Sequence, residues 1–188
     1  MLFVVTQSSQ HANALPTGDN FLYDSLLDVT FSMGSGSAEV DCKVYKYTSG
    51  DYADKYVYTY RISNVDSSIG LSFFSVGILD DANAYDPDFD VLVGAVEPAL
   101  WAIVRLSPPE TQVESVNGLF THTIDNGFSS ASLWFVSDYA STSSSGVLFG
   151  TSSGAPCYAT GDLLTPIPEP ATIFMFGTGW LMTLIRKR

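Results

Sequence analysis

Apolar and polar residues alternate along much of the chain with the period of two that is typical of half-buried β-strands. Between Ala38 and Val44 every second residue is apolar, and the residues in between are acidic or basic. The segment 56–62 repeats the pattern with three tyrosines and an isoleucine on one face. A short polar stretch around Gly50 separates the two segments, so a β-hairpin is the simplest interpretation.

Further strand-like segments follow, separated by Gly, Pro, Asn, Asp and Ser. They are residues 28–33, 69–79, 91–95, 100–106, 113–116, 119–124, 132–136 and 147–149. The mostly apolar segment 69–79 predicts a central strand, whereas 80–90 and 141–146 are expected to be loops. About nine to eleven strands without a helical period predict an all-β fold, an antiparallel β-sandwich over residues 15–164.

The last 24 residues, 165–188, differ from this body. Sixteen uncharged residues separate Glu169 from Arg186, and as a helix they would extend about 24 Å, which is short for a membrane crossing. A basic cluster ends the chain: Arg186, Lys187 and Arg188. Because basic residues beside a hydrophobic segment resist translocation, we expect a short transmembrane segment at 171–185 with the body outside. A plain C-terminal anchor or a buried hydrophobic helix is the alternative.

A proline-flanked acid precedes this segment, made by Pro168, Glu169 and Pro170. The prolines block a helix and keep the backbone extended. The box, the short Gly-containing apolar run and the basic end together resemble the PEP-CTERM sorting signal of exosortase substrates, although Phe, Met and Thr replace some of the family's frequent leucines. The resemblance implies cleavage at the box by a membrane-embedded exosortase and delivery to the surface of a Gram-negative bacterium that makes extracellular polysaccharide. The body also loosely resembles the β-sandwich ectodomains of that family.

The first residues suggest a second targeting element. Met1 to Val5 are apolar, and Ala12-Asn13-Ala14 fits an A-x-A cleavage site before a polar, turn-prone stretch. We interpret residues 1–14 as the remnant of a truncated signal peptide. A disordered N-terminus is the alternative.

The net charge bears on the possible partners, and the two cysteines bear on a possible disulfide. Up to Thr165 the chain holds nineteen acidic and five basic residues, a net charge of −14, which argues against nucleic acid as a partner. Cys42 and Cys157 are an even pair in a chain expected to be exported. Either they form a disulfide, worth about 4–5 kcal/mol by loop-closure entropy, or they are two small buried thiols.

The acidic segment Asp86, Asp88 and Asp90 has the alternating carboxylates of a calcium loop. Val91 stands where an EF-hand needs glycine, so an EF-hand is not expected. Two interpretations remain. The segment is either part of a looser calcium site that includes Asp80 and Asp81, or a solvated acidic loop.

Catalytic patterns are weak. Gly150 to Gly154 matches G-x-S-x-G, but no histidine follows Ser152, and His122 lies in an alternating run as a strand-surface residue. Trp101 and Trp134 could stack against a sugar or lie in the core. We therefore expect no enzyme but a structural or adhesive surface protein, with the membrane and an exosortase as partners before processing. A carbohydrate- or calcium-binding module is the alternative, and an extracellular hydrolase is a weaker one.

Overall fold

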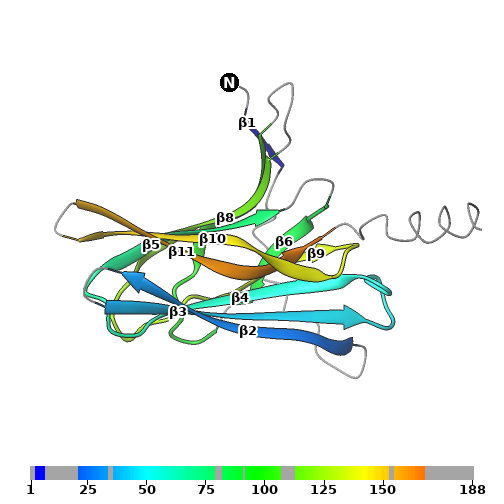
Figure 1. The fold of residues 1–188 in the computed structure, drawn as a ribbon, viewed down its shortest axis with the longest axis horizontal. Helices are drawn as coiled ribbons and strands as arrows, with labels where there is room; N and C mark the ends of the chain where they lie inside the picture. Colours follow the sequence, from blue (N-terminus) through cyan, green and yellow to red (C-terminus); the bar gives the residue numbers. More distant parts are fainter. Residues whose placement is uncertain are drawn as a thin grey trace, which may run out of the picture.

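The computed structural model describes residues 3–6, 21–33, 36–78, 82–90, 92–106, 113–152 and 155–167. These segments form eleven β-strands in two antiparallel sheets. Figure 1 shows the sheets as two layers, with β2, β3 and β4 in one layer and β5, β10 and β11 in the other. The predicted antiparallel β-sandwich is confirmed.

The five-stranded sheet has the order β2-β3-β4-β9-β6. Its strands are β2 (Phe21–Met33), β3 (Gly36–Tyr47), β4 (Tyr56–Asn64), β9 (Ser132–Ser137) and β6 (Tyr85–Asp90). The six-stranded sheet has the order β1-β7-β8-β5-β10-β11. Its strands are β1 (Phe3–Thr6), β7 (Pro98–Leu106), β8 (Val113–Ile124), β5 (Gly70–Ile78), β10 (Ser141–Ser152) and β11 (Ala155–Pro166). The segment 69–79 was predicted to be central, and β5 does lie between β8 and β10.

The predicted hairpin is β3 and β4, which pair antiparallel with Val40 opposite Ile62. The apolar face predicted for β3 is fully buried in the core, and so are Tyr58, Tyr60 and Ile62 of β4. Period-two alternation therefore placed the inner face of this hairpin correctly, because successive side chains of a strand point to opposite faces of the sheet. On the opposite face of β4, Val57 and Thr59 are buried as well.

A chain of aromatic rings runs through the core from one sheet to the other. Trp101 stacks on Phe74 with a centroid distance of 6.3 Å, and Phe74 lies 5.6 Å from Tyr60 across the sandwich. Tyr60 is followed by Phe135 at 5.9 Å, which stacks on Tyr58 at 5.1 Å. Such offset and tilted contacts add to the area that the rings bury, so this chain is a main connection between the two sheets.

The prediction of a loop over residues 80–90 is wrong for its second half, where β6 pairs with β9. The strand is short, bulged between Tyr85 and Asp88, and lies at the edge of its sheet. An edge position tolerates Pro87 because its missing amide would face away from the ladder, and charged side chains are common there. The predicted strand 91–95 is instead a turn from residue 92 on, with Gly94 at φ 80°.

Two other predicted interruptions lie within strands. The segments 113–116 and 119–124 were predicted as separate strands, but β8 continues through Asn117 and Gly118 between them. A Cβ on Gly118 would lie 3.1 Å from the Trp101 ring. Glycine is needed there for close packing. The predicted serine loop 141–146 belongs to β10, whose pairing with β11 extends from Ser141 to Ser152.

The N-terminal strand β1 pairs with β7 over four residues, from Phe3 opposite Leu106 to Thr6 opposite Ile103. These residues fall within the segment 1–14 assigned to a leader remnant. The leader stays a prediction, because pairing in the uncleaved chain does not say whether a peptidase removes it.

Candidate functional site

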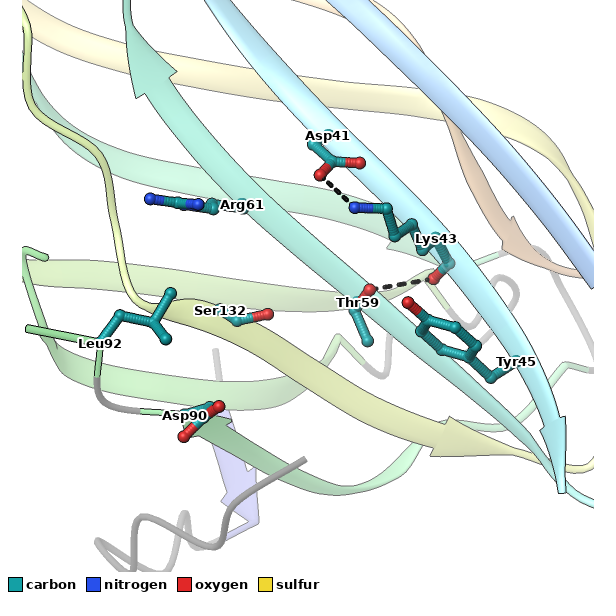
Figure 2. A pocket seen from close by; sticks show the side chains of 8 residues that line it. All are labelled: Asp41, Lys43, Tyr45, Thr59, Arg61, Asp90, Leu92 and Ser132. Atoms are coloured by element: carbon teal, nitrogen blue, oxygen red, sulfur yellow. Dashed lines mark hydrogen bonds and ion pairs between the residues drawn. The ribbon is translucent and has the colours of Figure 1, made fainter. Parts of the chain in front are cut away.

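A polar groove of about 220 Å³ lies on the outer face of the five-stranded sheet. Its walls come from four neighbouring strands and the turn after β6, and the lining residues are Asp41, Lys43, Tyr45, Thr59, Arg61, Asp90, Leu92 and Ser132. Each strand residue in it alternates with a core residue such as Cys42, Tyr60 or Leu133, which explains why it faces solvent. In Figure 2, Asp41 and Asp90 lie at opposite sides, with Arg61, Thr59 and Ser132 between them.

The charges of the groove are only partly neutralised within it. Lys43 Nζ lies 2.5 Å from Asp41 Oδ2, whereas Asp41 Oδ1 is shielded from solvent and has no hydrogen-bond partner among the described residues. Within the same residues the Arg61 guanidinium has no ion pair, although Arg61 lies directly opposite Asp41 in the strand register. Thr59 Oγ1 donates to the Lys43 carbonyl at 3.3 Å. The groove therefore offers a guanidinium that a polar ligand could contact, whereas Asp41 Oδ1 is closed to one.

Trp134 adjoins this groove. It lies opposite Thr59 in the register and packs with Val57 and Val136 under partly buried tyrosines, with only 3% of its surface exposed. Its indole N–H has no partner in the described part of the chain. Trp101 is 1% exposed and donates its indole N–H to the Trp134 carbonyl at 2.7 Å. Neither tryptophan is thus an open stacking platform. Trp101 lies in the core, as the alternative predicted, and Trp134 lies in a second packed cluster.

A hydrogen-bonded network around Asp138, the residue after β9, ties loops to the five-stranded sheet. Asp138 pairs with Lys55 and accepts hydrogen bonds from Asn83 and from Tyr85, the last at 3.1 Å. The hydrogen bond from Lys55, followed by that from Asn83, lowers the pKa of Asp138 below its usual value. Burial, followed by the charge of Asp138, raises the pKa of Tyr85. The network therefore favours a charged Asp138 and a neutral Tyr85, and its contacts are structural.

The three carboxylates of the calcium candidate do not converge. Asp86 accepts a 3.5 Å hydrogen bond from Tyr52, Asp88 caps the amide of Phe89 at 2.8 Å, and Asp90 lines the groove. Among the described residues no group of three or more His, Cys, Asp or Glu side chains could hold a metal ion. Asp80 and Asp81 lie outside the described residues.

The two cysteines are free, so the disulfide considered from the sequence is not formed. Cys42 Sγ lies 3.8 Å from the Leu164 carbonyl, and Cys157 is seven residues away from Leu164 on the same strand. At about 3.3 Å per residue, Cys157 lies about 23 Å along the strand from Leu164, the residue that Cys42 contacts. That separation is far beyond the Cα distance that a disulfide allows. Burial raises the pKa of Cys42 to about 12, so its thiol is unreactive.

Other sequence candidates are placed as follows. His122 is exposed on β8, as expected of a strand-surface residue. Gly150 and Thr151 belong to β10, and Ser153 and Gly154 lie outside the described residues. The Pro168-Glu169-Pro170 box and the cluster from Arg186 to Arg188 are also outside them. No helix of the described ranges is long and apolar enough to cross a membrane.

The groove was not predicted from the sequence. Its residues do show the outward half of an alternating pattern, as at Asp41, Lys43 and Tyr45. That signal says only that these side chains face solvent. Their meeting with Asp90 and Ser132, far along the chain, depends on β4 pairing with β9 and β9 with β6.

Comparison with known proteins adds no relative to this description. No protein-family model matches the chain, no curated protein is significantly similar, and no solved structure matches it.

Proposed function

We propose that this chain is an exported surface protein that an exosortase processes at Pro168-Glu169-Pro170. The released β-sandwich then serves as a non-catalytic structural or adhesive component of the envelope or polysaccharide matrix of a Gram-negative bacterium. The resemblance of residues 165–188 to a PEP-CTERM signal is the basis of the proposal. Before processing, the segment 171–185 would hold the protein in the inner membrane.

The observation that carries the proposal is where the sandwich ends. The last strand, β11, finishes at Pro166 after pairing with β10 along its whole length, and the Ile167 amide donates to the Ala140 carbonyl at 3.1 Å. The box begins at the next residue. Cleavage there would remove no strand of the sandwich, as release of a folded domain requires.

The test is the mass of the mature C-terminus from surface and membrane fractions of the native host. We expect a chain that ends near Pro170 and lacks residues 173–188. Glu169→Ala should leave the chain unprocessed, because it removes the only charge of the box, while Glu97→Ala, at an exposed site on the sandwich, should be processed normally. An intact tail in the wild type would mean a plain membrane anchor and would overturn the proposal.

The groove favours a second candidate function, the binding of carbohydrate. Sugars present adjacent hydroxyl groups that donate and accept hydrogen bonds, and here cations, carboxylates and hydroxyls from neighbouring strands line one cavity. The Arg61 guanidinium has no ion pair among the described residues, and its five fixed N–H donors suit hydroxyl or carboxylate oxygens of a sugar.

Affinity electrophoresis of the full chain in nonionic detergent, with dextran or alginate cast in the gel, tests this function. We expect one of the two to retard the wild type and Arg61→Ala to abolish the retardation. Lys46→Ala is the matched control, since Lys46 is a cation of the same strand pair and lies over the Tyr56 ring outside the groove. Equal retardation of wild type and Arg61→Ala would exclude the groove as the site.

A further inference from the structure

The outer face of the six-stranded sheet carries a continuous row of apolar side chains. Strand register places Tyr158 opposite Phe149, Phe149 opposite Phe73, Phe73 opposite Leu119, and Leu119 opposite Leu100. We call these five residues the apolar stripe. It crosses β11, β10, β5, β8 and β7 and spans about 19 Å at an inter-strand spacing of about 4.8 Å.

The stripe faces away from the core in every strand. Each of its members has a chain neighbour that is buried between the sheets, and these neighbours are Ala159, Leu148, Phe74, Phe120 and Trp101. Tyr158 is 72% exposed, Leu119 48% and Leu100 37%, while Phe149 and Phe73 between them are half-buried. Large apolar side chains that are aligned and open to solvent are a common sign of an interaction surface.

One of the two rows beside the stripe is uncharged. This row lies two residues away from the stripe on each strand and consists of Thr160, Val147, Ser75, Asn117 and Ala102. On the other side, Thr151 lies opposite both Pro156 and Gly70. That row continues with acidic residues: a Cβ on Gly70 would lie 3.0 Å from Asp125 Oδ1, and Glu97 lies beside Thr121. An apolar centre depleted of charge and bordered by hydroxyl and amide groups has the composition of a protein–protein interface.

We propose that the apolar stripe is a self-association surface on which a second copy of this chain docks face to face. The full chain has a net charge of −12, so two copies repel each other in most orientations. The stripe and the row from Thr160 to Ala102 carry no charge, so a copy that approaches over them avoids close contact between like charges, and the Asp125 and Glu97 carboxylates stay at the opposite border. The inference is independent of both the sorting signal and the groove.

Two-fold symmetry makes the stripe complementary to itself. An isologous contact brings the same patch of both copies together, so the Tyr158 end of one stripe meets the Leu100 end of the other and Phe73 lies near the axis. Two sheets packed in this way lie about 10 Å apart, as in an ordinary sandwich. Leu100 and Leu119 are aliphatic and the two phenylalanines have no hydrogen-bonding group, which fits a protein partner better than a sugar.

Sedimentation equilibrium of the full chain in a neutrally buoyant nonionic detergent tests the proposal. We expect a concentration-dependent species of twice the 20.3 kDa monomer mass, and tighter association as salt screens the acidic charge. Leu119→Asp should raise the dimer dissociation constant about 30-fold or more, the loss expected of a central interface residue. Tyr158→Asp, at the most exposed position of the stripe, should weaken the dimer in the same direction.

The matched control is Leu26→Asp, because Leu26 is 52% exposed on β2 of the other sheet. It should leave the dissociation constant unchanged. A monomeric wild type would overturn the proposal, as would a dimer that both stripe variants leave intact, since the tail or another face would then hold it. Tyr158→Asp keeps the test valid if Leu119→Asp fails to fold.

Discussion

The two outer faces of this sandwich differ although their inner faces are alike. Outside the five-stranded sheet, Asp41, Lys43, Arg61 and Asp90 make a charged groove next to the buried Trp134. Outside the six-stranded sheet, the apolar stripe crosses five strands without a charged member. Both faces rest on one hydrophobic core that includes residues of both sheets.

This difference shows which residues the fold leaves free to vary. Inward positions must be apolar in both sheets, because the core is common to them. Outward positions carry no such requirement and can differ in charge without a change of fold. The functions proposed for the two faces should therefore be separable by surface substitutions, while substitutions in the core should affect both.

The largest effect is expected from Phe74→Ala, which removes the core contact behind both faces. Phe74 is fully buried, follows Phe73 of the stripe, and packs against Tyr60, which lies between two groove residues. Truncation of a buried phenylalanine typically costs about 3–5 kcal/mol. Urea unfolding followed by tryptophan fluorescence should show this loss, and Phe128→Ala, at a 56% exposed site, should change stability by less than about 0.5 kcal/mol. Similar small losses for both variants would mean that Phe74 does not join the sheets.

A smaller loss of stability is expected from Gly150→Ala, a change in the six-stranded sheet that carries the stripe. A Cβ at this position would lie 2.5 Å from the Gly70 carbonyl oxygen of β5, which is backbone and cannot rotate away. We expect a loss of about 1–3 kcal/mol, typical of overpacking. Ser145→Ala, at an exposed position of the same strand, is the control in urea unfolding. Wild-type stability of the glycine variant would show that β5 and β10 separate easily at this bulge.

The smallest loss of stability is expected when low pH protonates Asp138, which follows β9 of the five-stranded sheet. Because the pKa of Asp138 in the folded protein is below its usual 3.8, its contribution to stability is present above that value and is lost as pH falls through the folded pKa. The group is well exposed, so the contribution should stay under about 1 kcal/mol. Urea midpoints at about pH 7 and about pH 3 should differ less for Asp138→Asn than for the wild type. An equal acid loss in both proteins would assign the pH dependence to other carboxylates.

The sequence by itself determined the fold class and the inner face of the hairpin, β3 with β4. Alternation is a local property, since every second side chain of a strand points the same way, and it can be detected without knowing the partner strand. The low charge of residues 69–79 likewise predicted a central strand, because such a strand is covered on both sides. Segments that were assigned as turns or loops from their residue types alone were assigned wrongly, as at Asn117, Gly118 and the serines of β10.

Only the tertiary structure decided which outward residues meet. The groove needs Arg61 on β4 beside Ser132 on β9 and Asp90 on β6, and the stripe needs Phe149 opposite Phe73. Sheet order and register depend on burying all the inner faces at once and on bulges such as those next to Phe73 and Phe149, and no local pattern specifies them. The same reason separates Cys42 from Cys157, since both lie on strands but at positions that the sandwich keeps apart.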